Sequence, residues 1–128
     1  QTMGKSSLSE LEINAIELKL SSLNKCESCM KGHTFLVKKA GLSDDDVQAL
    51  IRKDETSIER LNKLLRAAEY LYFSGSGIYP DLVLDFFEEE DISEQELFEI
   101  IGLISLKTVS NYVNNYLASI KIRQHANV

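Results

Sequence analysis

The chain has 128 residues, 44% of them hydrophobic and 27% charged, so it is predicted to form one globular domain, residues 1–128, with its own core. Fourteen Lys and Arg against twenty Asp and Glu give a net charge of −6. That balance argues against a nucleic-acid-binding protein, because such proteins carry a basic surface. Two cysteines are too few for a disulfide-stapled secreted scaffold.

The sequence contains no membrane-spanning signal. No segment approaches the roughly 18 consecutive apolar residues of a transmembrane helix, and the longest apolar patch lies near residues 100–106. The first residues include Lys5, Glu10 and Glu12 and lack the apolar core of a signal peptide. We therefore expect a cytoplasmic protein without a membrane partner, in which a cysteine pair stays reduced unless it turns over.

Helical periodicity runs through most of the chain. The first helix is predicted over about residues 8–23, where apolar side chains recur at steps of three and four. A second is predicted over about 26–40 and ends at Gly41, a residue type common just after a helix. A short helix over about 43–51 begins with Ser and Asp residues in capping positions, and a longer one covers about 58–71.

A Ser- and Gly-rich break at 74–77 separates these helices from two more. Pro80 suits the first turn of a fifth helix. Ser93 with Glu96 repeats the capping-box pattern and opens a long last helix that extends through Ile120. No alternating apolar run bounded by hairpin turns indicates a strand. The sequence therefore predicts an all-α fold, a bundle of about six helices.

Negative charge is concentrated between Asp81 and Glu99, where nine acidic residues occur without a basic one. The rest of the chain has eleven acidic and fourteen basic residues, a net charge of +3. Acidic residues are favourable near helix N-termini, so we interpret this segment as a solvated, acid-rich face. A patch that docks a partner is the alternative.

Three asparagines, Asn111, Asn114 and Asn115, lie inside the last predicted helix, where this residue type is unfavourable. They either form hydrogen bonds across a subunit interface or lie near the functional site, and the sequence leaves both alternatives open. Tyr112 and Tyr116 form an i,i+4 pair on the same helix, which we expect in the core or at an interface.

The segment with the clearest chemistry is residues 26–33, CESCMKGH. At about 100° per residue, Cys26, Cys29 and His33 lie within about 60° of one another on one helix face. Cys29 and His33 are close enough to exchange a proton. Cys26 lies at the first turn, where free N–H groups and the helix dipole favour a thiolate. The spacing supplies an attacking thiol, a resolving thiol and a proton carrier.

Two other interpretations of the same residues stay open. A CxxC pair serves redox, metal and packing roles alike. Zinc would bind Cys26, Cys29 and His33 and need a fourth group or a water, and one helical face does not spread three ligands tetrahedrally. Two buried, inert cysteines beside a solvent-facing histidine are the simplest reading. We expect no metal at this segment.

Residues 13–50 resemble the carboxymuconolactone decarboxylase and AhpD-like family, specifically its alkylhydroperoxidase branch. The family signature is CxxCxxxH followed by a KAGLSD turn and a short helix. The matching residues here are Cys26, Cys29, His33 and the segment Lys39–Asp44. Weaker similarity continues to residues 107–114, KTVSNYVN, after which Asn115 stands where a histidine often follows.

This resemblance implies an all-α fold of about six helices that assembles as homo-oligomers such as trimers or hexamers. It also implies a thiol-dependent peroxidase or disulfide reductase, in which Cys29 attacks a hydroperoxide, Cys26 resolves the product and His33 belongs to a proton relay. The reductant would be an external dithiol such as a lipoyl-bearing protein, with a peroxiredoxin partner in some systems. No cofactor is implied beyond the redox-active Cys26–Cys29 disulfide. The helix-dipole argument fits if Cys26 is the thiol that meets partner disulfides.

The sequence departs from this family at the relay. Members with full peroxidase function carry a Glu twelve residues before the first Cys, where this chain has Asn14, and often a His before the second Cys, where it has Ser28. Glu17, one turn after Asn14, substitutes if its helix directs it to the pocket. A surface position, common for Glu, is the alternative. The candidate catalytic residues are Cys26, Cys29, His33 and Glu17.

The function predicted from these residues is that of a thiol-dependent antioxidant oxidoreductase that reduces hydroperoxides. A general acid or base contributes about 10²–10⁴-fold to a reaction rate, so a missing relay group could reduce the peroxidase activity by that factor. Two alternative functions therefore stay open. One is a disulfide reductase with little peroxidase activity. The other is a non-enzymatic assembly or metal-binding module on the same fold. Lactone decarboxylation is not expected, because members of the family with that activity generally lack the Cys pair.

Overall fold

The computed structural model describes residues 7–75 and 77–126. Within these residues the chain forms six α-helices and no β-strand, which confirms the predicted all-α fold. The helices are α1 (Glu10–Leu23), α2 (Glu27–Lys39), α3 (Asp44–Ile51), α4 (Glu59–Ser74), α5 (Asp81–Glu89) and α6 (Glu94–Ala126). Among the described residues, no helix is long and apolar enough to cross a membrane.

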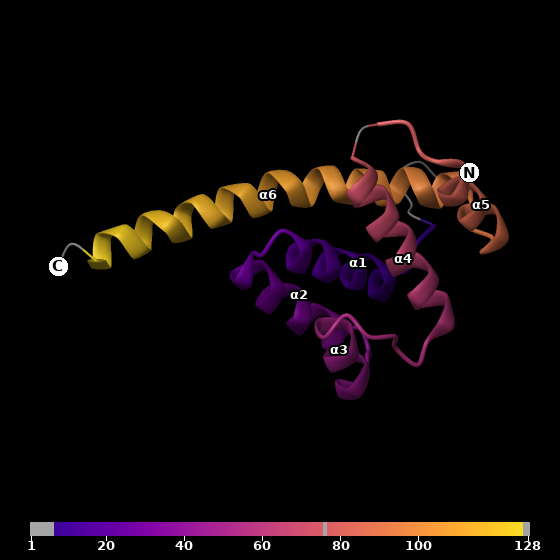
Figure 1. Ribbon diagram of the computed structural model, residues 1–128. Coiled ribbons are helices and arrows are strands. Elements are labelled where there is room, and N and C mark those ends of the chain that lie inside the picture. The colour runs from indigo at the N-terminus through magenta and orange to yellow at the C-terminus, as the bar shows by residue number, and fades with distance from the viewer. Residues whose placement is uncertain (1–6, 76, 127–128) are drawn as a thin grey trace.

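Helix α1 lies between α2 and α6 and is also contacted by α3 and α4 (Figure 1). It begins at a capping box, in which Ser9 and Glu12 satisfy each other's backbone N–H groups. Eight consecutive residues, 14–21, are buried, so this helix is covered on all its sides rather than along one stripe. Any polar side chain on this part of α1 must therefore find a partner inside the protein.

The hydrophobic core surrounds α1. Its largest contributions come from α1 and α4, and the helices α2, α3, α5 and α6 each add one or two side chains. The fully buried side chains include Ile16, Leu18, Leu20, Val37, Val47, Leu61, Leu64 and Ile100. Burial of these groups is the main favourable term in folding, at about 1.5–3 kcal/mol for each large aliphatic side chain.

Helix α6 spans 33 residues, about 50 Å, and only part of it packs on the other helices. Its buried residues are Ile100 and Asn111. Figure 1 shows the C-terminal part of the helix extending past the ends of α1 and α2. Most side chains after Asn111 are exposed, many of them apolar.

The acidic segment behaves as a solvated face. Glu90 pairs with Lys63 at 3.3 Å, Glu96 pairs with Arg60, and Glu99 accepts a hydrogen bond from the Ser7 N–H at 2.9 Å. The other six acidic residues of this segment are exposed. Ser93 and Glu96 form the predicted capping box, with bonds of 2.9 and 3.1 Å.

Asp46 connects α3 to the start of α4. Its two carboxylate oxygens accept hydrogen bonds from the Ser57 backbone N–H at 2.7 Å and the Ser57 hydroxyl at 2.6 Å. The Ser43 hydroxyl caps the same helix by accepting from the Asp46 N–H at 3.2 Å. Because the Ser57 bonds favour the charged form, they hold the pKa of Asp46 below its ordinary 3.8.

Replacing Asp46 with Asn is expected to lower the free energy of unfolding by about 1–3 kcal/mol, because one amide oxygen cannot replace two charged acceptors. The pKa of Asp46 is lower in the folded protein, so its contribution is complete above 3.8 and is lost as the pH falls through the folded pKa. Denaturant unfolding followed by circular dichroism should show the gap between wild type and Asp46→Asn narrowing in that acidic range. Asp45→Asn, an exposed neighbour, serves as the control and should change little.

Candidate functional site

The connection between α1 and α2 is a tight reversal that places Cys26. Asn24 caps the C-terminus of α1, and Lys25 adopts a left-handed conformation with φ of 56°. The Cys26 N–H then donates to the Ser21 carbonyl at 2.9 Å. This bond turns the chain back on α1, so that α2 starts beside the helix that has just ended.

Cys26 and Cys29 form a disulfide bond, with their Cα atoms 5.3 Å apart. Cys26 is the N-cap of α2 and has extended backbone angles. It therefore lies one residue before the helix, whereas the sequence predicted it in the first helical turn. Its side chain is 1% exposed, whereas Cys29 is partly exposed. The two sulfur atoms therefore differ in access, and Cys29 is the one that a molecule from solvent reaches first.

One turn after Cys29, His33 joins a cluster of three ionisable side chains from three helices. Its Nδ1 lies 3.7 Å from Glu17 Oε1 on α1, and its Nε2 lies 3.1 Å from Lys107 Nζ on α6. Lys107 Nζ also lies 3.9 Å from Glu17 Oε2. The three side chains are only 11–12% exposed. We call Glu17, His33 and Lys107 the buried triad.

Burial sets the protonation of this triad. Burial, and after it the positive charge of Lys107, lower the pKa of His33 from 6.5 to about 4. Burial raises the pKa of Glu17 above 4.5, and the charge of Lys107 offsets part of that rise. At neutral pH His33 is therefore uncharged, and its contact with Glu17 is not an ion pair.

The structure brings the four candidate residues to one region and answers the question of Glu17. Glu17 is buried at 9% exposure and faces His33, so the surface alternative is wrong. Asn14, at the position of the family's usual Glu, donates to the Glu10 carbonyl within its own helix at 3.0 Å. Ser28 lies with its hydroxyl 3.7 Å from Cys26 Sγ.

Lys107 is the member of the triad that the sequence analysis did not single out. It lies 74 residues after His33 on a different helix, so no local spacing connects the two. A weak signal was present: at seven residues after Ile100 and four before Asn111, Lys107 lies on the same helix face as these two residues, which are both buried. A lysine at a core-facing position indicates a buried partner.

A second polar cluster fastens α6 to the loop that carries Cys26. Asn24 donates to the Asn111 side-chain oxygen at 2.8 Å and accepts from the Tyr72 hydroxyl at 2.7 Å. Asn111 donates to the Ser21 hydroxyl at 3.3 Å, and Asn115 donates to the Asn24 carbonyl at 3.1 Å. Asn111 and Asn115 therefore lie near the site, whereas Asn114 is exposed and binds only the Ser110 carbonyl of its own helix.

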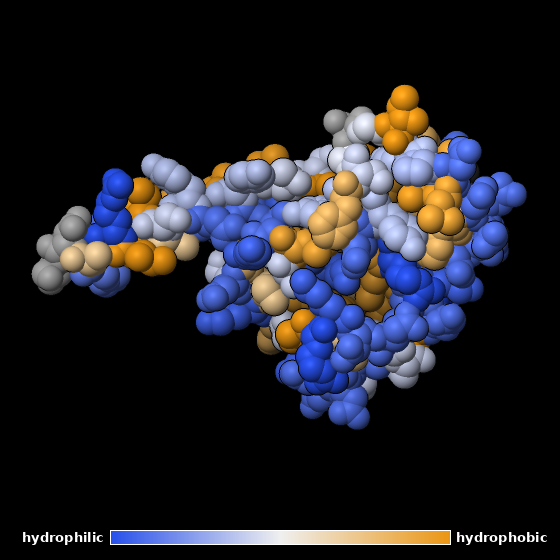
Figure 2. Space-filling model, viewed as in Figure 1, coloured by the Kyte–Doolittle hydropathy of each residue, from blue (hydrophilic) through white to orange (hydrophobic). Residues whose placement is uncertain are grey.

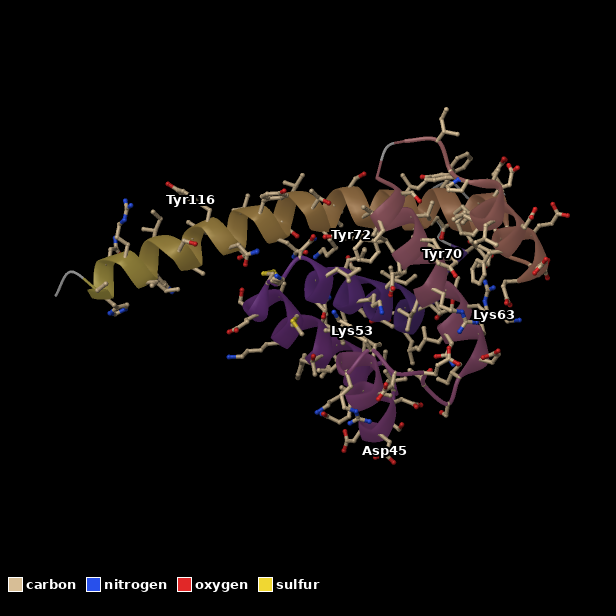
Figure 3. All side chains as sticks on the ribbon, viewed as in Figure 1. Asp45, Lys53, Lys63, Tyr70, Tyr72 and Tyr116 are labelled. Carbon is tan, nitrogen blue, oxygen red and sulfur yellow. A yellow bond between two sulfur atoms is a disulfide. The ribbon has the colours of Figure 1, made fainter. Side chains whose placement is uncertain are left out.

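An open groove of about 460 Å³ runs beside the cysteine pair, between the start of α2 and the distal part of α6. Its lining residues are Lys25, Glu27, Ser28, Lys31, Asn115, Ala118, Ser119 and Ile122. Two lysines make this groove locally positive, in contrast to the acidic chain as a whole. Figure 3 shows the yellow sulfur–sulfur bond near the turn that joins α1 to α2.

Metal binding is the alternative use of the same residues. Across residues 7–75 and 77–126, no group of three or more His, Cys, Asp and Glu side chains is arranged to hold a metal ion. The two sulfur atoms are bonded to each other, and His33 faces Glu17 and Lys107.

Residues 1–70 match the carboxymuconolactone decarboxylase family. The chain belongs to this family. No curated protein matches the sequence significantly. In this family member, the matched region contains Glu17, Cys26, Cys29 and His33, whereas Lys107 lies outside it.

Replacing Asn111 with Ala is expected to lower the free energy of unfolding by about 1–3 kcal/mol, because the half-buried Asn24 amide then loses its acceptor. Thermal and denaturant unfolding of the purified variant would measure this loss. Asn114→Ala is the matched control, since it removes the same group from an exposed position of the same helix. Equal effects of the two substitutions would contradict a structural role for the buried cluster.

Proposed function

We propose that the protein is a thiol-dependent oxidoreductase that reduces hydroperoxides through the Cys26–Cys29 pair. The observation that carries this proposal is the disulfide formed between a partly exposed and a buried cysteine, one helical turn from the buried triad. A family match alone would not distinguish a redox enzyme from other members. The disulfide and an adjacent set of proton carriers are the groups that this chemistry needs.

The oxidative half of the cycle begins at Cys29, because its sulfur is the accessible one. The Cys29 thiolate attacks the distal peroxide oxygen, the O–O bond breaks, and the alkoxide takes a proton to leave as the alcohol. Cys29 is then a sulfenic acid. The Cys26 thiol attacks its sulfur, water leaves, and the disulfide forms. The two electrons that reduce the peroxide come from the two thiols.

The reductive half requires an external dithiol, for which a lipoyl-type donor is the proposed class. A donor thiolate attacks Cys29 Sγ, and the sulfur–sulfur bond breaks with its electron pair on Cys26. The second donor thiol then displaces Cys29, and the donor leaves as a disulfide. Cys26 is a good leaving group here, because an N-cap position at the positive end of α2 stabilises a thiolate. An oxidised peroxiredoxin is the alternative partner for the reduced pair.

His33 and Glu17 form the proton relay of this cycle. A carboxylate with a raised pKa can take the thiol proton and return it to the leaving alkoxide, and the uncharged imidazole in contact with it can orient that carboxylate. Glu17 thus substitutes for the relay Glu that the resemblance places at position 14, where this chain has Asn14. We place the cycle in the cytoplasm, where dithiol reductants keep protein thiols reduced.

Cys29→Ser is expected to abolish peroxide consumption, because the accessible nucleophile is removed. Cys26→Ser is expected to react once and stall as a sulfenic acid on Cys29, because the resolving thiol is missing. Each variant retains a single cysteine, so thiol counting and the mass shift from a sulfenic-acid reagent identify the reacting sulfur without ambiguity. Ser105→Ala, at an exposed position of α6 outside this site, should react as wild type does.

Three outcomes separate this function from its alternatives. If near-stoichiometric hydroperoxide leaves both thiols of the reduced protein intact, the peroxidase proposal fails. If the disulfide then still exchanges with a dithiol donor, the protein is a disulfide reductase with little peroxidase activity. If neither reaction occurs, a non-enzymatic assembly module is the better description.

We also propose that the protein self-associates through α6. Five apolar residues follow a three–four–three–four spacing on one face of this helix, the spacing of a coiled-coil seam. They are Leu106, Val109, Val113, Tyr116 and Ile120, which we call the α6 stripe. The first four are 52–66% exposed, and Figure 3 shows Tyr116 pointing away from α1 and α2. Figure 2 shows apolar residues continuing along the part of α6 that projects from the bundle.

Helix stability and charge both favour a second copy of the chain as the partner of this stripe. An isolated helix end without packing is marginally stable in water, so the projecting part needs a partner. The first turn of α6 carries the exposed Glu94, and its C-terminal turns carry the exposed Lys121 and Arg123. Antiparallel pairing of two α6 helices would bring these opposite charges together about a two-fold axis.

Val113→Glu is expected to shift the protein toward the monomer, because two carboxylates would be buried near the centre of the pair. Size-exclusion chromatography with light scattering would give the mass, as a multiple of 14.5 kDa for wild type and 14.5 kDa for the variant. Leu82→Glu, at an 80% exposed apolar position on α5, is the matched control. A monomeric wild type would contradict the proposal.

A further inference from the structure

The least expected group at the site is Lys107. Its side chain is 12% exposed, although lysines usually extend their ammonium group to water. Its Nζ contacts both other members of the buried triad, at 3.1 Å from His33 Nε2 and 3.9 Å from Glu17 Oε2. The redox steps proposed above do not use this cation, so its placement calls for a separate explanation.

Hydrogen-bonding rules fix what each atom of the triad can do. A protonated lysine has only donors, so His33 Nε2 is the acceptor in the 3.1 Å contact. A neutral imidazole has one hydrogen, and with Nε2 accepting, that hydrogen belongs on Nδ1. Nδ1 is buried without a hydrogen-bond partner, and Glu17 Oε1 is 3.7 Å from it. The N–H is thus aimed at a carboxylate slightly beyond hydrogen-bonding distance.

The charges around His33 act in opposite directions. Lys107 lowers the pKa of the imidazole, in addition to the larger effect of burial. A carboxylate at the position of Glu17 would raise it, if no cation were present. On the third helix packed against α2, Asp46 is engaged by Ser57, and the exposed Asp44 pairs with Lys38. The balance at His33 is therefore set by Glu17 and Lys107.

We propose that Lys107 is a positioning residue that holds His33 as the uncharged Nδ1–H tautomer, so that Glu17, rather than the imidazole, exchanges the proton of the site. Lys107 blocks Nε2 and disfavours a second proton on the ring. Glu17 is then the base that receives the thiol proton, and His33 orients that base through its N–H. This use of the proton rests on the proposed function, whereas the tautomer is a property of the folded chain itself.

Nitrogen-15 NMR of histidine-labelled protein tests the proposal in the disulfide form. The chain contains two histidines, and the exposed His125 near the end of α6 provides an internal reference. The His33 ring is expected to show the Nδ1–H tautomer and no titration between about pH 5 and 8. This measurement needs no substitution, so it stands even if a variant fails to fold.

Lys107→Met and Lys107→Arg then separate charge from packing. Lys107→Met keeps the apolar part of the side chain and removes the cation, so the pKa of His33 is expected to rise above its wild-type value of about 4, while burial, the larger cause of its lowering, persists. Lys107→Arg keeps a positive donor and should preserve an uncharged His33. A purely structural role for Lys107 would lower the stability of both variants without changing the charge state of His33.

Two results would overturn the inference. One is a wild-type His33 with its hydrogen on Nε2. The other is a folded Lys107→Met protein whose His33 keeps both the wild-type tautomer and the wild-type pKa. Neither depends on peroxide, so their outcome is independent of the thiol-counting experiment. A protein with the expected tautomer but unreactive thiols would retain this inference and lose the proposed peroxidase function.

Discussion

The burial of α1 on all its sides is the constraint on which the rest of the structure depends. A helix in this position brings its polar residues into the interior, where an unpaired charge costs several kcal/mol. Three of these residues are matched by other helices: Lys19 by Glu69 of α4 at 2.8 Å, Ser21 by Asn111 of α6, and Glu17 by the other two members of the buried triad. The fourth, Asn14, is matched within α1 by the Glu10 carbonyl. The contacts that form the site therefore also stabilise the packing of α1 against the other helices.

The fold was predictable because its determinants are local. Ser9, Ser43 and Ser93 each cap a helix within three residues of their position, and Gly41 ends one with φ of 108°. Apolar steps of three and four along α4 need no tertiary information to be recognised. The cysteine pair and His33 were likewise visible, since their spacing is that of one helical turn and the next.

The environment of these residues was not predictable to the same degree. Periodicity tells which face of a helix is buried only when the other face is polar, and α1 has buried residues all round. The sequence could therefore not place Glu17 inside or outside. Lys107 reaches His33 only through the packing of α6 on α1, and Asn111 and Asn115 reach Asn24 in the same way. Such contacts between distant segments depend on how helices cross, which local spacing does not contain.

Helix α6 has two faces with different contacts. Ile100, Lys107 and Asn111 face the bundle, and the α6 stripe faces away from it. Substitutions can alter one face and spare the other, but a change in length cannot. One residue inserted between Ile100 and Lys107 would rotate everything after it by about 100°. Lys107 would then leave His33, and the stripe would turn toward the bundle. We expect homologous chains that keep both features to vary in sequence along this stretch while keeping the number of residues constant.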